Sequence, residues 1–125
     1  MIVDTDVLIW HLKGNEKARK AVSAQVPFDI SVITYMEIVQ GMRNKAELRL
    51  LLKQLQKWSV KILHFDTDIS NRAMFYVEEM HLSHAVGLAD ALIAATVVER
   101  GDTLLTANDK HYRPIPKLQL KIFRP

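Results

Sequence analysis

Short apolar runs of strand length alternate along the chain with segments whose apolar residues recur at helical spacing. The most regular segment is 45–58, where four leucines share one helix face and basic residues occupy the other. The predicted strands are residues 2–3, 28–33, 60–65, 103–106 and, at an edge of the sheet, 118–123. The predicted helices are residues 7–12, 16–24, 34–41, 45–58, 69–80 behind an Asp66 N-cap, and 88–100. This alternation predicts an α/β fold with a mostly parallel sheet of four to five strands and helices on both faces.

Two helix boundaries carry specific signals. Thr34 and Glu37 form a capping-box pattern, in which Thr34 is the N-cap and Glu37 reaches back to its backbone. Gly101 follows the apolar helix 88–100 and is expected to end it. The capping box alone explains Glu37, although a first turn just beyond a strand is also where a metal-directed carboxylate would lie.

Length and composition indicate a single domain, residues 1–125, with an ordinary globular balance of 49% hydrophobic and 25% charged residues. The chain has no Cys, which excludes disulfides, thiolate metal sites and Cys nucleophiles and fits a cytoplasmic location. No positively charged segment precedes the first strand, so no signal peptide is expected. The longest apolar stretch, 88–98, contains Asp90 and is too short to span a bilayer, so no membrane association is expected.

The net charge of +3 is modest, and on charge alone a solvated surface is favoured over nucleic-acid binding. If the carboxylates are collected at one place, however, the rest of the surface is more basic and would attract a phosphate backbone. His111, with Lys110 and Arg113, either meets phosphate or is solvated. Neither a Gly-rich phosphate loop nor a Gly-x-Ser-x-Gly elbow occurs.

Acidic or amide side chains follow the ends of the predicted strands. Asp4 follows the first strand, Glu37 lies beyond the second, Asn108 and Asp109 follow the fourth, and Asp90 opens the helix 88–100. Ligand sites of parallel sheets form beyond the carboxyl ends of the strands, so these residues can meet. A cluster of carboxylates repels itself unless a cation holds it, and hard divalent cations prefer such oxygens. The pattern therefore predicts metal-dependent chemistry on a phosphate ester.

Each of these residues also has a structural interpretation. Asp4 is a good N-cap for the helix that follows, and Asp6 adds a favourable negative charge to its first turn. Asn108 and Asp109 are residue types expected in any turn. Asp90 is the sharpest signal, because an unpaired carboxylate buried among small apolar residues would be costly. That cost favours a functional position for Asp90 over a solvated helix start.

Taken together, these segments resemble the PIN-domain family, and within it the VapC-type toxins of prokaryotic toxin–antitoxin pairs. The resemblance covers nearly the whole chain. Its four motifs correspond to residues 2–9, residues 31–37 with Gly41, residues 88–95 and residues 104–112. Each motif is weak alone, but four in the family's order in a chain of this length are specific.

The resemblance implies a PIN-like three-layer fold and a Mg²⁺- or Mn²⁺-dependent endoribonuclease acting on RNA. It also implies a homodimer and a cognate antitoxin that blocks the site. Asp4, Glu37 and Asp90 would hold the metal, while Thr106 and Asn108 would orient water or phosphate. The family's fourth acidic position falls on Asn108, with Asp109 one residue later, and which of the two faces the site stays open.

Two other functions remain open from the sequence. Asp4-Thr5-Asp6 after a strand is similar to the nucleophile motif of haloacid-dehalogenase-like phosphatases, in which Asp4 would be phosphorylated. That motif has a Thr where this chain has Leu8. The third possibility is a basic α/β module that binds RNA or a partner without cleaving it.

Overall fold

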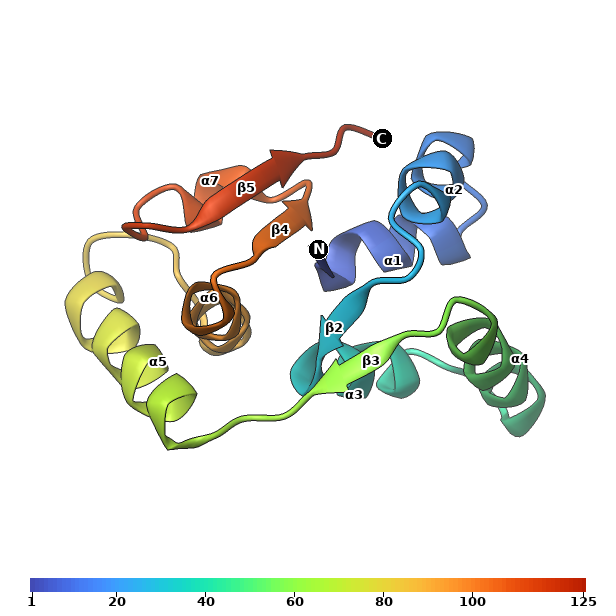
Figure 1. The fold of residues 1–125 in the computed structure, drawn as a ribbon, viewed down its shortest axis with the longest axis horizontal. Coiled ribbons are helices and arrows are strands. Elements are labelled where there is room, and N and C mark those ends of the chain that lie inside the picture. Colours follow the sequence, from blue (N-terminus) through green and yellow to red (C-terminus); the bar gives the residue numbers. More distant parts are fainter.

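A parallel five-stranded sheet runs through the computed structural model, which describes residues 1–125 (Figure 1). The strand order is β3-β2-β1-β4-β5, and every neighbouring pair is parallel. The strands are β1 Ile2–Val3, β2 Asp29–Ser31, β3 Lys61–Leu63, β4 Thr103–Thr106 and β5 Gln119–Ile122. The helices are α1 Thr5–Leu12, α2 Glu16–Ser23, α3 Val32–Gln40, α4 Lys45–Lys57, α5 Thr67–Met80, α6 Leu88–Arg100 and α7 Asp109–Tyr112. The predicted fold is confirmed, and the sheet is parallel throughout.

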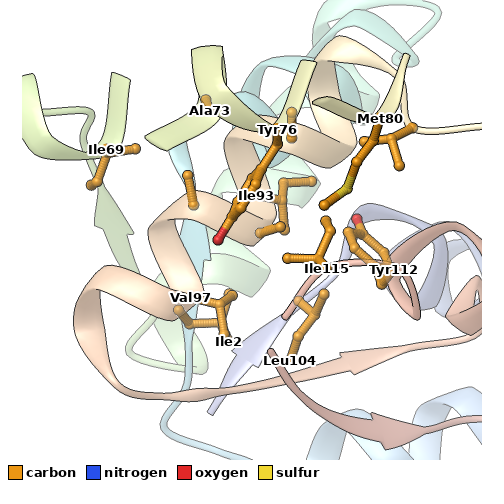
Figure 2. Close-up of a cluster of buried hydrophobic side chains, with 14 of the residues drawn as sticks. Ile2, Ile69, Ala73, Tyr76, Met80, Ile93, Val97, Leu104, Tyr112 and Ile115 are labelled. Carbon is orange, nitrogen blue, oxygen red and sulfur yellow. The ribbon is translucent and has the colours of Figure 1, made fainter. Parts of the chain in front are cut away.

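Alternation along the two central strands separates the interior into two hydrophobic clusters. Ile2 pairs with Leu104, and both point into the cluster covered by α5 and α6 (Figure 2). Val3 pairs with Leu105, and both point into the cluster covered by α1, α2 and α4. In Figure 1 these two sets of helices lie on opposite sides of the sheet, which gives three layers. Strands buried on both faces explain the continuous apolar runs in the sequence.

The strand order reverses beside β1, and this reversal positions the functional residues. From β1 the chain adds β2 and β3 on one side, then returns to add β4 and β5 on the other. Asp4 follows β1 and Ala107 follows β4, so the two segments leave neighbouring strands at the same edge of the sheet. A crevice beyond the carboxyl ends of strands at such a reversal is where open α/β sheets place their ligands.

The second strand and the helix after it differ from the prediction. The strand ends at Ser31, and α3 begins at Val32 with Ser31 as its N-cap, because the Ser31 hydroxyl accepts from the backbone N–H of Ile33. Thr34 is therefore fully buried inside α3. The predicted capping box of Thr34 and Glu37 is wrong, which leaves Glu37 available for another role.

Other boundary predictions are confirmed, and one helix was not predicted. The Asp66 side chain accepts from the N–H of Ile69 at 2.8 Å, and Gly101 ends α6 in the left-handed region at φ 61°. The four-residue helix α7 occupies residues for which the sequence indicated a turn. No helix combines the length and the apolar character needed to cross a membrane.

Candidate functional site

Asp4 is a buried carboxylate held on both of its oxygens. Oδ1 accepts from the backbone N–H of Thr5 at 2.8 Å, as an N-cap, and Oδ2 accepts from the hydroxyl of Thr106 at 2.8 Å. Only 3% of Asp4 is exposed. The sequence left capping and chemistry as alternatives for Asp4, yet one side chain caps α1 and also faces β4. Thr106, predicted as a site residue, is thereby placed beside Asp4, and its oxygen also accepts from the N–H of Asn108 at 3.0 Å.

Asp6 joins Asp4 from the first turn of α1. Its Oδ2 accepts from the backbone N–H of Ala107 at 3.0 Å, which ties α1 to the end of β4. Its Oδ1 is buried and makes no hydrogen bond. From the sequence, Asp6 was expected as a helix-start charge or as the second Asp of a phosphatase motif, because its contact with Ala107 spans 101 residues. A buried carboxylate oxygen without a donor is a free ligand atom.

Asp90 lies half-buried in the first turn of α6. Its Oδ2 accepts from the backbone N–H of Gly87 at 3.3 Å and lies 3.4 Å from Nδ1 of His111. The charge of Asp90 also raises the pKa of Asp6, so the two carboxylates are electrostatic neighbours. Asp90, Asp6 and Asp4 thus gather from α6 and the start of α1 at one edge of the sheet.

Burial and repulsion by neighbouring carboxylates raise the pKa values of the two innermost carboxyls, Asp4 and Asp6. Burial, followed by the charge of Asp6, raises the pKa of Asp4 from 3.8 to about 7, against the lowering effect of the bonds from Thr106 and Thr5. Burial also raises the pKa of Asp6. The Tyr112 hydroxyl is buried without a hydrogen-bond partner, and burial and the Asp4 charge raise its pKa strongly. We infer that Asp4 and Asp6 would ionise more readily with a cation beside them.

Glu37 approaches this group through Thr5 rather than directly. Thr5 Oγ1 lies 2.8 Å from Glu37 Oε1 and 2.9 Å from Thr34 Oγ1. A carboxylate can only accept, so the single Thr5 O–H donates to Glu37 and the Thr34 O–H donates to Thr5. The buried Thr34, which the sequence assigned to a cap, instead helps to orient Glu37.

The structure separates Asn108 from Asp109. Asn108 is exposed at the start of α7, and its side chain makes no capping hydrogen bond. Asp109 is buried and forms ion pairs with Arg113 and with Arg124, the latter at 2.8 Å. Arg124, then Arg113, lowers the pKa of Asp109. Of the two residues, Asp109 is committed to a structural pair, and Asn108 remains the fourth candidate for the site.

The donor set suits a hard divalent cation. No three Asp, Glu or His side chains are positioned to enclose an ion between them. Mg²⁺, however, keeps several waters and is usually held by only one or two protein carboxylates. The buried, unbonded Oδ1 of Asp6 and the raised pKa of Asp4 are the features expected where a cation would complete the charge balance. The residues present therefore fit such an ion.

Comparisons with known proteins agree with this geometry. The model of the PIN domain family matches residues 1–118. Ribonuclease VapC10 of Mycobacterium tuberculosis is 37% identical over 123 residues, which is 95% of this chain and 90% of that protein. A toxin–antitoxin complex from Klebsiella pneumoniae is similar in structure, with a TM-score of 0.79, 28% identity and coverage of 94% and 93% of the two chains. DNA-bound VapBC from Salmonella typhimurium also has a TM-score of 0.79, with 25% identity and coverage of 97% and 96%.

Proposed function

The chain belongs to the PIN domain family, and we propose that it is a metal-dependent endoribonuclease that serves as the toxin of a toxin–antitoxin pair. The observation that carries the proposal is the group of carboxylates Asp4, Asp6 and Asp90 beyond β1 and β4. Its support is the similarity to a protein named as a ribonuclease and to a toxin–antitoxin complex. The reaction would be hydrolysis of an RNA phosphodiester bond.

In this proposal the carboxylates of Asp4, Asp6 and Asp90 hold Mg²⁺ or Mn²⁺. When bound, such an ion lowers the pKa of a water and offsets negative charge on the phosphate in the transition state. Thr106 fixes the orientation of Asp4, and Thr5 fixes one oxygen of Glu37. The other oxygen of Glu37 is then free to orient a water. Asn108 would orient water or phosphate from the start of α7.

The sequence beside Asp4 argues against the phosphatase alternative. Leu8 occupies the position where that phosphatase motif has Thr. An RNA-binding module without catalysis would not need a buried, mutually repelling group of carboxylates.

The proposed function is tested with purified protein and single-stranded RNA. We expect cleavage with Mg²⁺ or Mn²⁺ and none with EDTA, because the ionised carboxylates need the cation to act. The Asp4→Asn variant, purified in the same way, should be inactive and controls for contaminating nucleases. Cleavage that persists in EDTA would show that the metal-dependent mechanism is wrong, and equal cleavage in the variant would show that the activity does not come from this site.

The largest hollow of the surface is a suitable docking place for the antitoxin. It is a groove of about 750 Å³ between α1, α3 and α4, with apolar walls that include Ile9, Leu12 and the 68%-exposed Leu50. Glu37 also lines the groove, so an occupant can extend from the groove toward the carboxylates. We propose that an antitoxin segment with an apolar face binds here and places an Arg or Lys near Glu37.

A second apolar surface lies on α5 and α6, where Met74, Leu88 and Leu92 surround a hollow. Met74 is 58% and Leu88 is 73% exposed. Exposed apolar patches of this kind commonly mark protein–protein contacts. We propose that a second copy of the chain packs here, which would give the expected homodimer.

The two surfaces can be distinguished with matched variants. Leu50→Asp places a charge in the groove and should weaken antitoxin binding at least ~10-fold without changing the mass of the toxin alone. Met74→Glu should reduce the mass in solution from twice 14.3 kDa to the single-chain value, with antitoxin binding retained. Light scattering and titration calorimetry measure the two effects, and each variant is the control for the other. If Leu50→Asp binds the antitoxin normally, the groove is not its site.

A further inference from the structure

A second, polar hollow adjoins the carboxylate group. Its volume is about 410 Å³, and it lies between the start of α7 and the segment after β5. Only one of its lining residues is hydrophobic; the lining is formed by Ala107, Asn108, Asp109, Lys110, His111 and Arg124. This composition suits a charged ligand and not an apolar one.

The hollow and the carboxylate group share a wall. The backbone N–H of Ala107 donates to Asp6, and the carbonyl of the same residue accepts from Arg124 at 3.1 Å. His111 lines the hollow while its Nδ1 lies 3.4 Å from Asp90 Oδ2. A chain-like ligand with a group at the carboxylates would therefore have its neighbouring group at this hollow.

The charges around the hollow leave a positive excess. Asp109 is its only carboxylate, and both of its oxygens are already paired, one with Arg113 and one with Arg124. Arg124 is thereby held in a fixed orientation. Lys110 is exposed and takes part in no ion pair. Three cations, Lys110, Arg113 and Arg124, thus surround this single carboxylate, and this excess of positive charge favours an anion.

Resting on the proposed function, we propose that this hollow is a subsite for a backbone phosphate of RNA that adjoins the cleaved one, held by Lys110 and Arg124. A phosphodiester repeats along RNA at every nucleotide, so a polyanion bound at the carboxylates presents a second phosphate to the shared wall. His111 separates the two sites and would position Asp90 on one side and this phosphate on the other. The site acts on the backbone and carries no base specificity.

Lys110→Ala tests this subsite, with Lys53→Ala as the matched control on the exposed face of α4. Binding of labelled single-stranded RNA is measured by fluorescence anisotropy in EDTA, where no metal-dependent cleavage occurs, over a range of salt concentrations. Lys110→Ala should raise Kd about 3- to 10-fold and reduce the slope of log Kd against log salt by about 0.7, the value for one lost phosphate contact on a single strand. Lys53→Ala should change neither quantity. With metal, Lys110→Ala should raise KM and leave kcat within about twofold.

Equal Kd and equal salt slopes for Lys110→Ala and Lys53→Ala would overturn the subsite. That result would overturn the subsite alone, because the unchanged protein could still cleave RNA normally and the proposed function would be unaffected. Conversely, absence of cleavage with any divalent metal, together with the expected loss of binding in Lys110→Ala, would overturn the proposed function and support the phosphate site.

Discussion

Asp90→Asn is expected to reduce RNA cleavage by on the order of 100-fold or more while leaving the metal-free fold as stable as before. Asparagine keeps the size of the side chain and can still accept from the N–H of Gly87. It removes a charge that raises the pKa of Asp6. The lost repulsion offsets the roughly 0.3–1 kcal/mol that a first-turn charge gains from the helix dipole. Thermal melts with and without Mn²⁺, paired with the cleavage assay, measure both effects.

Asp68→Asn provides the matched control, because Asp68 also lies in the first turn of a helix, but on α5, which contributes no residue to the carboxylate group. It should lose only the helix-dipole contribution and should keep both cleavage and the rise in melting temperature with Mn²⁺. Asp90→Asn should lose most of that rise, since one ligand charge is gone. If Asp90→Asn cleaves RNA and melts at a lower temperature than the unchanged protein, Asp90 acts only as a helix-start charge, as Asp68 does.

The metal-free protein is expected to lose stability as pH rises from about 4 to about 7. Asp4 has a pKa of about 7 in the folded chain, against 3.8 as its ordinary value. Between these values the folded state retains a proton that the unfolded state has lost, so raising the pH favours unfolding. At about 1.36 kcal/mol for each pKa unit, the total loss is at most about 4 kcal/mol. Urea unfolding at several pH values measures the slope.

The difference between the unchanged protein and Asp4→Asn isolates this effect, since other groups also titrate in the same range. Burial raises the pKa of Asp6, which adds to the loss at high pH. Burial lowers the pKa of the half-buried His11, which has the opposite sign and gains stability as pH rises toward 6.5. Asp4→Asn keeps the His11 contribution and removes that of Asp4 together with its interaction with Asp6, so the difference reports the buried pair of Asp4 and Asp6. If the free energy of unfolding changes with pH in the same way in both proteins, folding does not raise the pKa of Asp4, and this prediction is wrong.

Local patterns were sufficient for the order of the elements and for most of their ends. A strand buries the apolar residues of 2–3 and 103–106, and a helix gathers the leucines of 45–58 on one face. The start of α3 was misplaced because Ser31 and Thr34 are equally good caps. The choice between them depends on Thr5, whose hydroxyl takes Thr34 into the interior.

The site was predictable in its residue types but not in its pairings. Asp4 and Asp90 were proposed from their surroundings, and Thr106 from the family resemblance; the structure places Thr106 beside Asp4. Asp6 was left out because its partner, Ala107, is distant in sequence. The choice between Asn108 and Asp109 was left open for the same reason, since Arg124 reaches Asp109 from beyond β5. In each case the deciding contact is tertiary, and no local rule contains it.

The central place of β1 has a consequence for how this protein is made. During synthesis β1 emerges about a hundred residues before its partner β4, and the hydrogen bond from Thr106 to Asp4 spans 102 positions. Until β4 is in place, one edge of β1 is unpaired and the pocket around Asp4 is open to water. Contacts this distant along the chain also slow folding. A chain that lacks β4 would thus also lack the hydrogen bond from Thr106 that orients Asp4, so the proposed site is assembled only after β4 has joined the sheet.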